Sequence, residues 1–396
     1  MLDLNFLQDR YVQMVKKSVH QRNLVIYGAG VYARKLHKFL LDNGLKVECF
    51  CVSSRAGNLE LVEGLPVKTM ADWKNEELKN ILFLLGVTWP ASEEIMLQIQ
   101  ANPYVQVLSV PSYFELLLDE MYSRPVLEIT PLAGCKVNCK FCPQELFLKN
   151  YFSKSGKKEM NFAEFKRCLD KTPKELVVDF SGFVEPFLAQ DAVQMILYCA
   201  EQGRQVRLFT TLRGLTFAKF KEIEDVPFSM VVLHLPDKYG FANIPVTDEY
   251  LKLLEVVTSK VKPGGRRFVD TANCQAEPDE RAAAVLQGRV PISWSLIDRA
   301  GNLQNEGLAS GKVLAGEACF CRRAGRLDHN VLLPNGDVVL CCMDFGMRHI
   351  LGNLLRDDYD DILSSAEMKK VQKSLIGVGD SLCRYCTSAE RRSILQ

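Results

Sequence analysis

Three cysteines crowded into one short loop constrain this chain more than any other feature of its sequence. They are spaced Cys135-x3-Cys139-x2-Cys142 and follow an apolar, strand-like run over residues 126–130. Thiolates are soft ligands that favour zinc, copper(I) or iron-sulfur clusters, and this spacing lets one loop surround a single inorganic centre. No fourth cysteine or histidine lies nearby to close the site. A cubane iron-sulfur cluster on three thiolates would keep one iron free for another ligand.

This x3/x2 triad after a first strand resembles the signature of the radical S-adenosylmethionine (SAM) superfamily. The resemblance implies a [4Fe-4S] cluster on Cys135, Cys139 and Cys142 whose open iron binds the amino and carboxylate groups of SAM. It also implies an electron donor of the flavodoxin or ferredoxin type. A zinc knuckle or a chance clustering of cysteines is the alternative.

Composition limits the class of protein and its partners. The 396 residues indicate two or three domains, and 49 Lys and Arg against 48 Asp and Glu predict no basic face for nucleic acid. The N-terminus has no secretory pattern, and no apolar run approaches the about 18 residues of a membrane span. Nine of the 14 cysteines are grouped, which indicates reduced, metal-binding thiols. We therefore expect a cytoplasmic protein without nucleic-acid or membrane partners.

The N-terminal region, residues 1–122, is expected to hold an amphipathic helix and a Rossmann-like domain. A buried strand over residues 23–27 runs into Gly28-x-Gly30-x-x-Ala33, a form of the dinucleotide fingerprint. The second strand ends without the acid that would grip the ribose of NAD, and Arg55 favours a phosphate partner instead. Residues 23–110 resemble the N-terminal domains of sugar acetyltransferases. Binding of a nucleotide or nucleotide sugar and a purely structural or docking role are both open.

Residues 123–310 alternate strand and helix patterns, which predicts a partial (β/α)6 barrel with its active site at the carboxyl ends of the strands. The whole chain is therefore expected to be of the α/β class.

Two segments at predicted strand ends resemble motifs of the superfamily that bind SAM. Gly182, Glu185 and Pro186 resemble the Gly-Gly-Glu-Pro motif that receives the methionyl amino group, with Ser181 in place of the first glycine. Thr210 and Thr211 resemble a segment near the ribose. For Glu185, a surface role at a strand end is the alternative.

Three further residues at predicted strand ends are catalytic candidates. His234 and Asp237 follow the fourth strand, and either a catalytic or a structural role is open for them. Cys274 stands near the end of the next strand, where its thiol would donate a hydrogen atom or pack inertly.

The C-terminal region, residues 311–396, carries six more thiols around a hairpin signalled by Asn335-Gly336, and a helix is expected over residues 359–374. The pattern resembles the twitch or SPASM modules of radical SAM enzymes, which implies one auxiliary [4Fe-4S] cluster. We expect its ligands to be Cys321, Cys341, Cys383 and Cys386, with Cys319 and Cys342 as the other members of two ambiguous pairs. A four-cysteine zinc ribbon is the alternative.

Together these resemblances imply a radical SAM oxidoreductase or epimerase with two [4Fe-4S] clusters. We expect a small, sugar-related substrate, with oxidation favoured and epimerisation next. A peptide-modifying radical SAM enzyme, or a non-catalytic iron-sulfur electron-transfer or regulatory protein, is the alternative.

Overall fold

The computed structural model describes residues 4–19, 22–55, 58–87, 91–110, 114, 118, 121–262, 265–294, 296, 298–303, 316–321 and 323–391. Contacts divide the chain into two compact units, Met1–Ser123 with Ile394–Gln396, and Arg124–Ser393. The boundary expected at residues 310 and 311 lies outside the described residues, so a separate C-terminal domain stays a prediction. Among the described residues, no helix is both long and apolar enough to cross a membrane.

The first unit is an open α/β sheet. Its six strands have the order β3-β4-β2-β1-β5-β6 and are parallel except for the β3–β4 pair. The strands are β1 (Asn23–Tyr27), β2 (Cys49–Val52), β3 (Leu61–Val62), β4 (Leu65–Thr69), β5 (Ile81–Leu85) and β6 (Gln106–Leu108). The helices are α1 (Leu4–Val19), α2 (Val31–Asp42), α3 (Asn75–Leu78), α4 (Ala91–Gln100) and the 3-10 turn η1 (Met70–Asp72). The short β3–β4 hairpin was not predicted, because its strands are too short for a period-two pattern.

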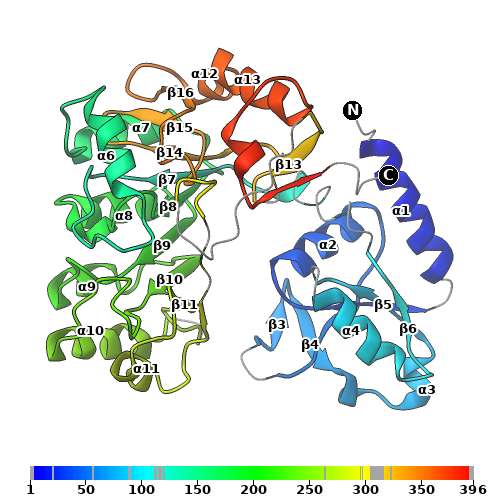
Figure 1. The fold of residues 1–396 in the computed structure, drawn as a ribbon. Helices are drawn as coiled ribbons and strands as arrows, with labels where there is room; N and C mark the ends of the chain where they lie inside the picture. The colour runs from blue at the N-terminus through cyan, green and yellow to red at the C-terminus, as the bar shows by residue number, and fades with distance from the viewer. Residues whose placement is uncertain are drawn as a thin grey trace. The chain divides into compact units, whose positions relative to one another are not determined.

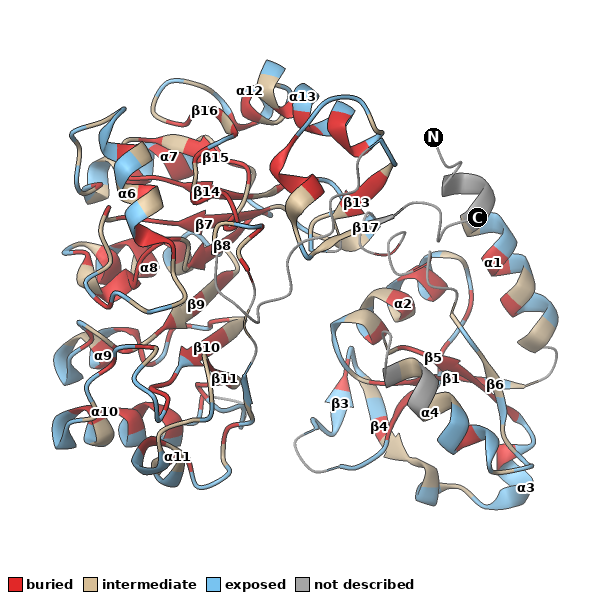
Figure 2. Ribbon diagram, viewed as in Figure 1, coloured by how far each residue is buried: buried red, intermediate tan, exposed pale blue. Residues whose placement is uncertain are grey.

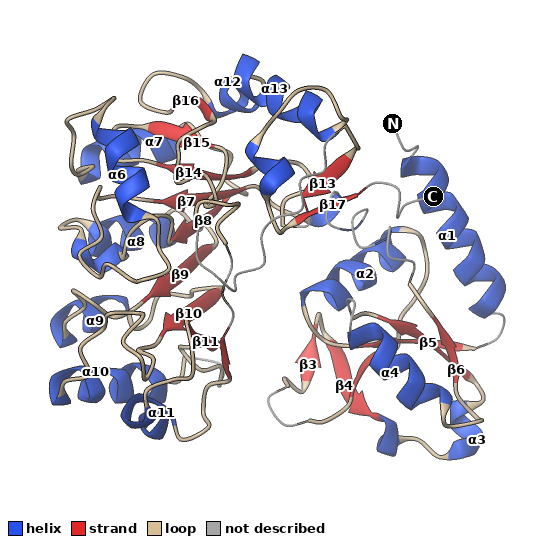
Figure 3. Cartoon of the chain, in the orientation of Figure 1, coloured by secondary structure: helices blue, strands red, loops and turns tan. Residues whose placement is uncertain are grey.

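The second unit contains six parallel strands that pair in chain order. They are β7 (Val126–Ile129), β8 (Val177–Phe180), β9 (Val206–Thr210), β10 (Met230–His234), β11 (Thr271–Cys274) and β12 (Ile292–Trp294). Between them lie α6 (Gln144–Phe152), α7 (Phe162–Asp170), η2 (Pro186–Leu188), α8 (Ala192–Glu201), α9 (Phe217–Ile223), α10 (Asp248–Ser259) and α11 (Glu280–Leu286). Helices and strands alternate along this part of the chain, and α8, α9 and α10 lie along one face of the sheet (Figures 1 and 3). The expected partial (β/α)6 barrel is confirmed.

Strands β7 and β8 are buried on both sides, but the two sides differ in chemistry (Figure 2). Leu127 and Ile129 of β7 belong to the apolar core that packs against the helices. The opposite face carries a charged row, in which Glu128 pairs in register with Asp179 and Asp179 with Arg207. This row lies beneath the ends of the strands that carry the site.

The C-terminal segment extends the same sheet. Strand β14 (His329–Leu332) pairs in parallel with β7, and β15 (Asp337–Val339) and β16 (Ile350–Asn353) continue it in antiparallel fashion. The expected hairpin is present, and its turn needs glycine because Gly336 has φ 88°. A separate pair joins β13 (Cys319–Cys321) to β17 (Ala389–Arg391), and η3 (Leu382–Tyr385) precedes β17.

One helix prediction in this segment was wrong. A single helix was expected over residues 359–374, but the structure has α12 (Tyr359–Leu363) and α13 (Ala366–Leu375). The side chain of Ser365 accepts a hydrogen bond from the Met368 N–H and so begins a new helix there.

Candidate functional site

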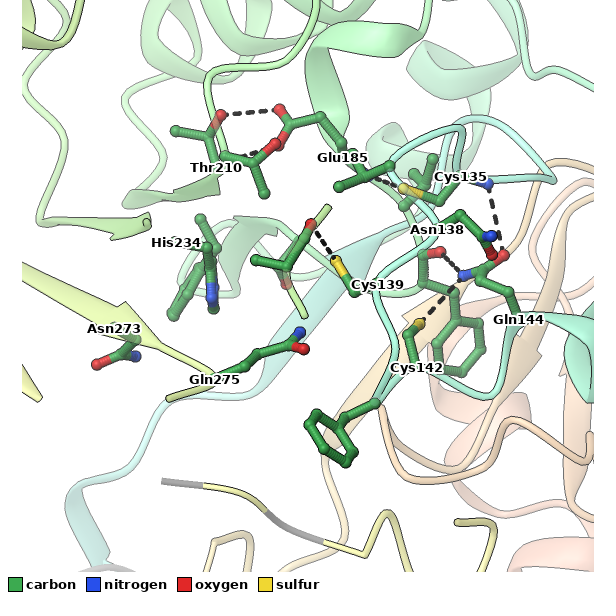
Figure 4. A pocket seen from close by; sticks show the side chains of 18 of the residues that line it. Cys135, Asn138, Cys139, Cys142, Gln144, Glu185, Thr210, His234, Asn273 and Gln275 are labelled. Carbon is green, nitrogen blue, oxygen red and sulfur yellow. Dashed lines mark hydrogen bonds between the residues drawn. The ribbon is translucent and has the colours of Figure 1, made fainter. Parts of the chain in front are cut away.

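A cavity of about 300 Å³ opens at the carboxyl ends of the barrel strands. It brings together the three cysteines of the loop after β7, Glu185 after β8, and Thr210 and Thr211 at the end of β9. These residues are far apart in the sequence, and Figure 4 shows the cysteine side chains and Glu185 around one space. Three of the predicted segments therefore meet in one site.

The cysteine loop is held from the side by the segment after β10. The backbone N–H of Lys140 donates to the Phe241 carbonyl at 2.8 Å, and the Cys139 thiol donates to the Ala242 carbonyl at 3.2 Å. Asn243 Nδ2 donates to the Val137 carbonyl at 2.6 Å. These bonds satisfy backbone groups of an irregular loop and set its shape before any metal binds.

Gln144, at the start of α6, ties the loop to the rest of the site and was not predicted. Its Nε2 donates to the Phe183 carbonyl at 2.5 Å and contacts Cys142 Sγ at 3.6 Å. Its Oε1 accepts from the backbone N–H of Cys135 at 3.4 Å. A polar residue two positions after the third cysteine was the only sequence signal for this role.

The three thiols lie in a buried environment that disfavours their charge. Burial raises the pKa of Cys139 to about 12 and also raises the pKa of Cys135 and of Cys142. Without a metal the thiols are therefore protonated at neutral pH. Coordination to iron removes those protons, so cluster binding should release protons.

Glu185 is buried and its carboxylate is fully held. Its oxygens accept from Thr210 Oγ1 at 2.8 Å, from the N–H and Oγ1 of Thr211 at 2.5 and 2.6 Å, and from the Phe187 N–H at 3.3 Å. Burial nevertheless raises its pKa above the usual value, and among the described residues no positive side chain pairs with it. The carboxylate is therefore positioned to receive a cation.

Two neighbours of Glu185 explain why the strand end has this sequence. Pro186 begins η2, where its missing N–H costs nothing. Gly182 has φ 70°, and a Cβ there would collide with Thr130 Oγ1. Only glycine fits at this close approach.

Of the three remaining catalytic candidates, two line the cavity and one does not. The residues that line the cavity include His234, Cys274, Asn273 and Gln275. Figure 4 labels all of these except Cys274. Burial within the protein and, second, the charge of Arg299 lower the pKa of His234 to about 4. Because its ring is exposed to the open cavity, water there weakens this shift until the cavity is filled.

Asp237 is not among the residues that line the cavity. It is buried, and its carboxylate accepts from the backbone N–H groups of Tyr239, Phe241 and Ala242 at 2.7 to 3.0 Å. It therefore shapes the segment that supports the cysteine loop.

A second pocket gathers the C-terminal thiols. Its lining includes Cys321, Cys341, Cys342, Cys383 and Cys386. Burial raises the pKa of Cys383 to about 12, and the neighbouring thiols of Cys321 and Cys386 add to this increase. Cys341 also lies close enough to Cys383 for their charges to interact. The predicted set of four thiols is thus brought together.

The other two thiols have different surroundings. Cys319 is fully buried in the core and is not among the residues that line this pocket. Cys342 accepts a contact from Arg323 Nη1 at 3.4 Å, and after burial the charge of Glu128 is the main cause that raises its pKa to about 12. These surroundings favour Cys341 over Cys342 as the ligand.

Both groups of thiols suit iron-sulfur clusters in their chemistry. Thiolates are soft ligands that favour such clusters, and in a cubane each thiolate binds a different iron. Among the described residues, no group of three His, Cys, Asp or Glu side chains is arranged to hold a single metal ion.

In the first unit, the first glycine of the fingerprint has a packing role, whereas a Cβ on Gly30 would meet no atom within 4 Å. Gly28 has φ 118°, and a Cβ there would lie 2.6 Å from the Gly86 carbonyl oxygen after β5. Gly30 precedes α2. Arg55, expected to favour phosphate, instead pairs with Asp72 at 2.9 Å. Binding of a nucleotide at this turn stays a prediction.

Comparisons with known proteins find similar structures and one matching family. Several solved structures are similar: BtrN in complex with AdoMet and 2-DOIA (15% identity, TM-score 0.44, 67% of this chain and 93% of that one) and native anSMEcpe with bound AdoMet (13%, 0.41, 67% and 89%). Streptococcus suis SuiB is another (14%, 0.42, 76% and 82%). A search of curated proteins found no match. Residues 319–387 match the SPASM family, an iron-sulfur cluster-binding domain, and this confirms the prediction that the chain carries a SPASM-like module at its C-terminal end.

Proposed function

We propose that this protein is a radical SAM enzyme. The observation that carries the proposal is the meeting of Cys135, Cys139, Cys142 and an uncompensated buried carboxylate, Glu185, in one cavity. Three thiols can hold a four-iron cluster with one iron open, and the carboxylate can receive the ammonium group of a ligand on that iron. A plain electron carrier would need neither the cavity nor the carboxylate.

The residues of the chain have separable tasks in this reaction. When bound, the cluster and SAM would supply a 5'-deoxyadenosyl radical that takes a hydrogen atom from the substrate. Thr210 and Thr211 hold Glu185 in the orientation that receives the SAM amino group. The same cavity is lined by Phe141 and Phe209. Their rings would exclude water and keep the substrate close to the radical carbon of the 5'-deoxyadenosyl group.

The C-terminal thiols support net oxidation of the substrate. In a cluster on Cys321, Cys341, Cys383 and Cys386, the protein coordinates every iron, so no iron is free to bind the substrate. The function that remains for such a cluster is electron transfer. An external donor of the flavodoxin or ferredoxin type would reduce the SAM-binding cluster. The N-terminal resemblance to domains of sugar acetyltransferases favours a sugar-related substrate.

Epimerisation is the second candidate, and one observation favours it. Cys274 lines the cavity, and burial raises its pKa to about 12, so its thiol keeps its hydrogen. Such a thiol can return a hydrogen atom to a substrate radical. Turnover in deuterium oxide distinguishes the two reactions. Oxidation gives a product that lacks two hydrogens, whereas epimerisation gives a product that has gained one deuterium. With Cys274→Ala, this deuterium should no longer enter the product.

The proposed function is tested by binding and spectroscopy. Anaerobically reconstituted protein is reduced with dithionite, and its electron paramagnetic resonance spectrum is recorded with and without SAM. A change in the spectrum on adding SAM, absent in Cys139→Ala, is expected because SAM binds the open iron. A spectrum that SAM leaves unchanged would favour the electron carrier.

A further inference from the structure

The cavity holds one positive side chain for which its other residues provide no partner. Among the described residues that line it, the only charged side chains are Glu185 and Arg299. Arg299 makes no ion pair or side-chain hydrogen bond with any described residue. Its guanidinium lies over the ring of Phe345, 5.9 Å from the centroid.

The backbone around Arg299 is strained and braced. Arg299 has φ 53° and Ala300 has φ 56°, a left-handed pair that side-chain-bearing residues rarely adopt. Buried Asp298 accepts from the Ala300 N–H at 3.1 Å. Asn302 Nδ2 donates to the carbonyls of Arg299 at 2.7 Å and Met343 at 2.8 Å. Such strain persists only where the surroundings enforce it, and it often marks a functional position.

Arg299 acts electrostatically on both cysteine sites. Burial raises the pKa of Cys142 and of Cys342, and the positive charge of Arg299 opposes both increases. Its charge also contributes to the lowered pKa of His234, which leaves that ring neutral. The guanidinium is therefore within electrostatic range of both groups of cysteines.

We propose that Arg299 binds a negatively charged group of the substrate, a carboxylate or a phosphate. The planar guanidinium matches both groups with two parallel N–H donors, and partial removal from water strengthens such bonds. This inference rests on the proposed function, and it narrows the substrate to an anionic molecule, such as a sugar acid or sugar phosphate, rather than a neutral one.

The test uses inorganic phosphate as the probe. Full-length protein is reconstituted anaerobically and loaded with SAM, and binding of labelled phosphate is measured by equilibrium dialysis at millimolar concentration. Arg299→Gln should weaken phosphate binding about tenfold or more, since a charge-assisted bond is lost. Arg299→Lys should weaken it less, because it keeps the charge without the fork. The matched control is Arg281→Gln, which removes an exposed arginine that pairs with Asp248.

Several results would overturn the proposal. One is phosphate binding that is the same in the wild type and Arg299→Gln. If that variant fails to fold, Arg299→Met, which also removes the charge, takes its place, and unchanged phosphate binding in it has the same meaning. A tenfold loss of SAM affinity in Arg299→Gln would instead assign the guanidinium to the SAM carboxylate and reject the substrate role. Failure of the wild type to bind SAM would reject the proposed function. Phosphate binding would then be compared between the wild type and Arg299→Gln without SAM, which would still test the anion site.

Discussion

A buried carboxylate without a countercharge is the clearest sign of ligand binding at the scale of single residues. Glu185→Gln keeps the shape of the side chain but removes the charge that pairs with an ammonium group, and its one oxygen can accept only part of the four hydrogen bonds. Loss of such a charge-assisted bond costs about 1.5 to 3 kcal/mol, so SAM affinity should fall about 10- to 150-fold. Equilibrium dialysis with labelled SAM measures this, with Glu201→Gln on the exposed end of α8 as the control. Equal losses in the two variants would reject this role for Glu185.

The residues that the sequence placed correctly at the cavity are those whose pattern depends on local spacing. The three cysteines of one loop, and Glu185 beside Pro186, can be recognised from neighbouring letters. Gln144 and Arg299 cannot, because their roles depend on contacts with Phe183 and Phe345 that only the folded chain creates. Asp237 shows the reverse case, since a polar residue at a strand end can serve the backbone of the following loop.

The charged row across β7, β8 and β9 joins the strands that carry the site. Glu128 pairs with His329 of β14 at 2.8 Å, and its other oxygen accepts from Ser181 Oγ at 3.0 Å and the Gly182 N–H at 3.1 Å. Asp179 forms a two-pronged ion pair with Arg207. Because these side chains are buried, removing one partner leaves another charge without compensation.

Glu128→Gln should therefore destabilise the second unit by about 3 to 5 kcal/mol at pH 7. Burial alone would raise the pKa of Glu128, but the His329 partner outweighs it and holds the pKa at about 2. A lowered pKa stabilises the fold above the ordinary value of 4.5, and this contribution is lost as the pH falls through 2. Urea unfolding at pH 7 and pH 3 should show a smaller difference between wild type and variant at pH 3. A difference that is equal or larger at pH 3 would contradict this assignment.

The order of strands and helices in the barrel was predictable because strand-like runs such as β10 alternate along the chain with helical patterns. The sequence did not predict connections that depend on contacts formed only in the folded chain. The β3–β4 hairpin forms because β4 can add to the edge of β2, and its strands alone carry too few residues to signal it. Ser365 caps the start of α13 and so divides the expected helix, but in the sequence this serine looks like any other.

At the scale of the whole molecule, the two groups of thiols should hold two independent clusters. Each cubane carries the same iron and sulfide, so replacing Cys135, Cys139 and Cys142 by Ala should lower both contents by about half. Replacing Cys321, Cys341, Cys383 and Cys386 should have the matching effect. Metal analysis after reconstitution measures this, and a triple variant with unchanged iron, or zinc in the C-terminal group, would contradict two clusters.

The central claim is that the barrel cavity cleaves SAM, and the most direct measurement is the yield of 5'-deoxyadenosine from reduced, reconstituted protein and SAM under anaerobic conditions. The account predicts that the wild type forms it, that the triple variant of Cys135, Cys139 and Cys142 forms none, and that a control variant of Cys49 and Cys51, in the first unit, forms as much as the wild type. A wild type that carries both clusters and binds SAM but yields no 5'-deoxyadenosine, or a triple variant that yields as much as the wild type, would contradict it.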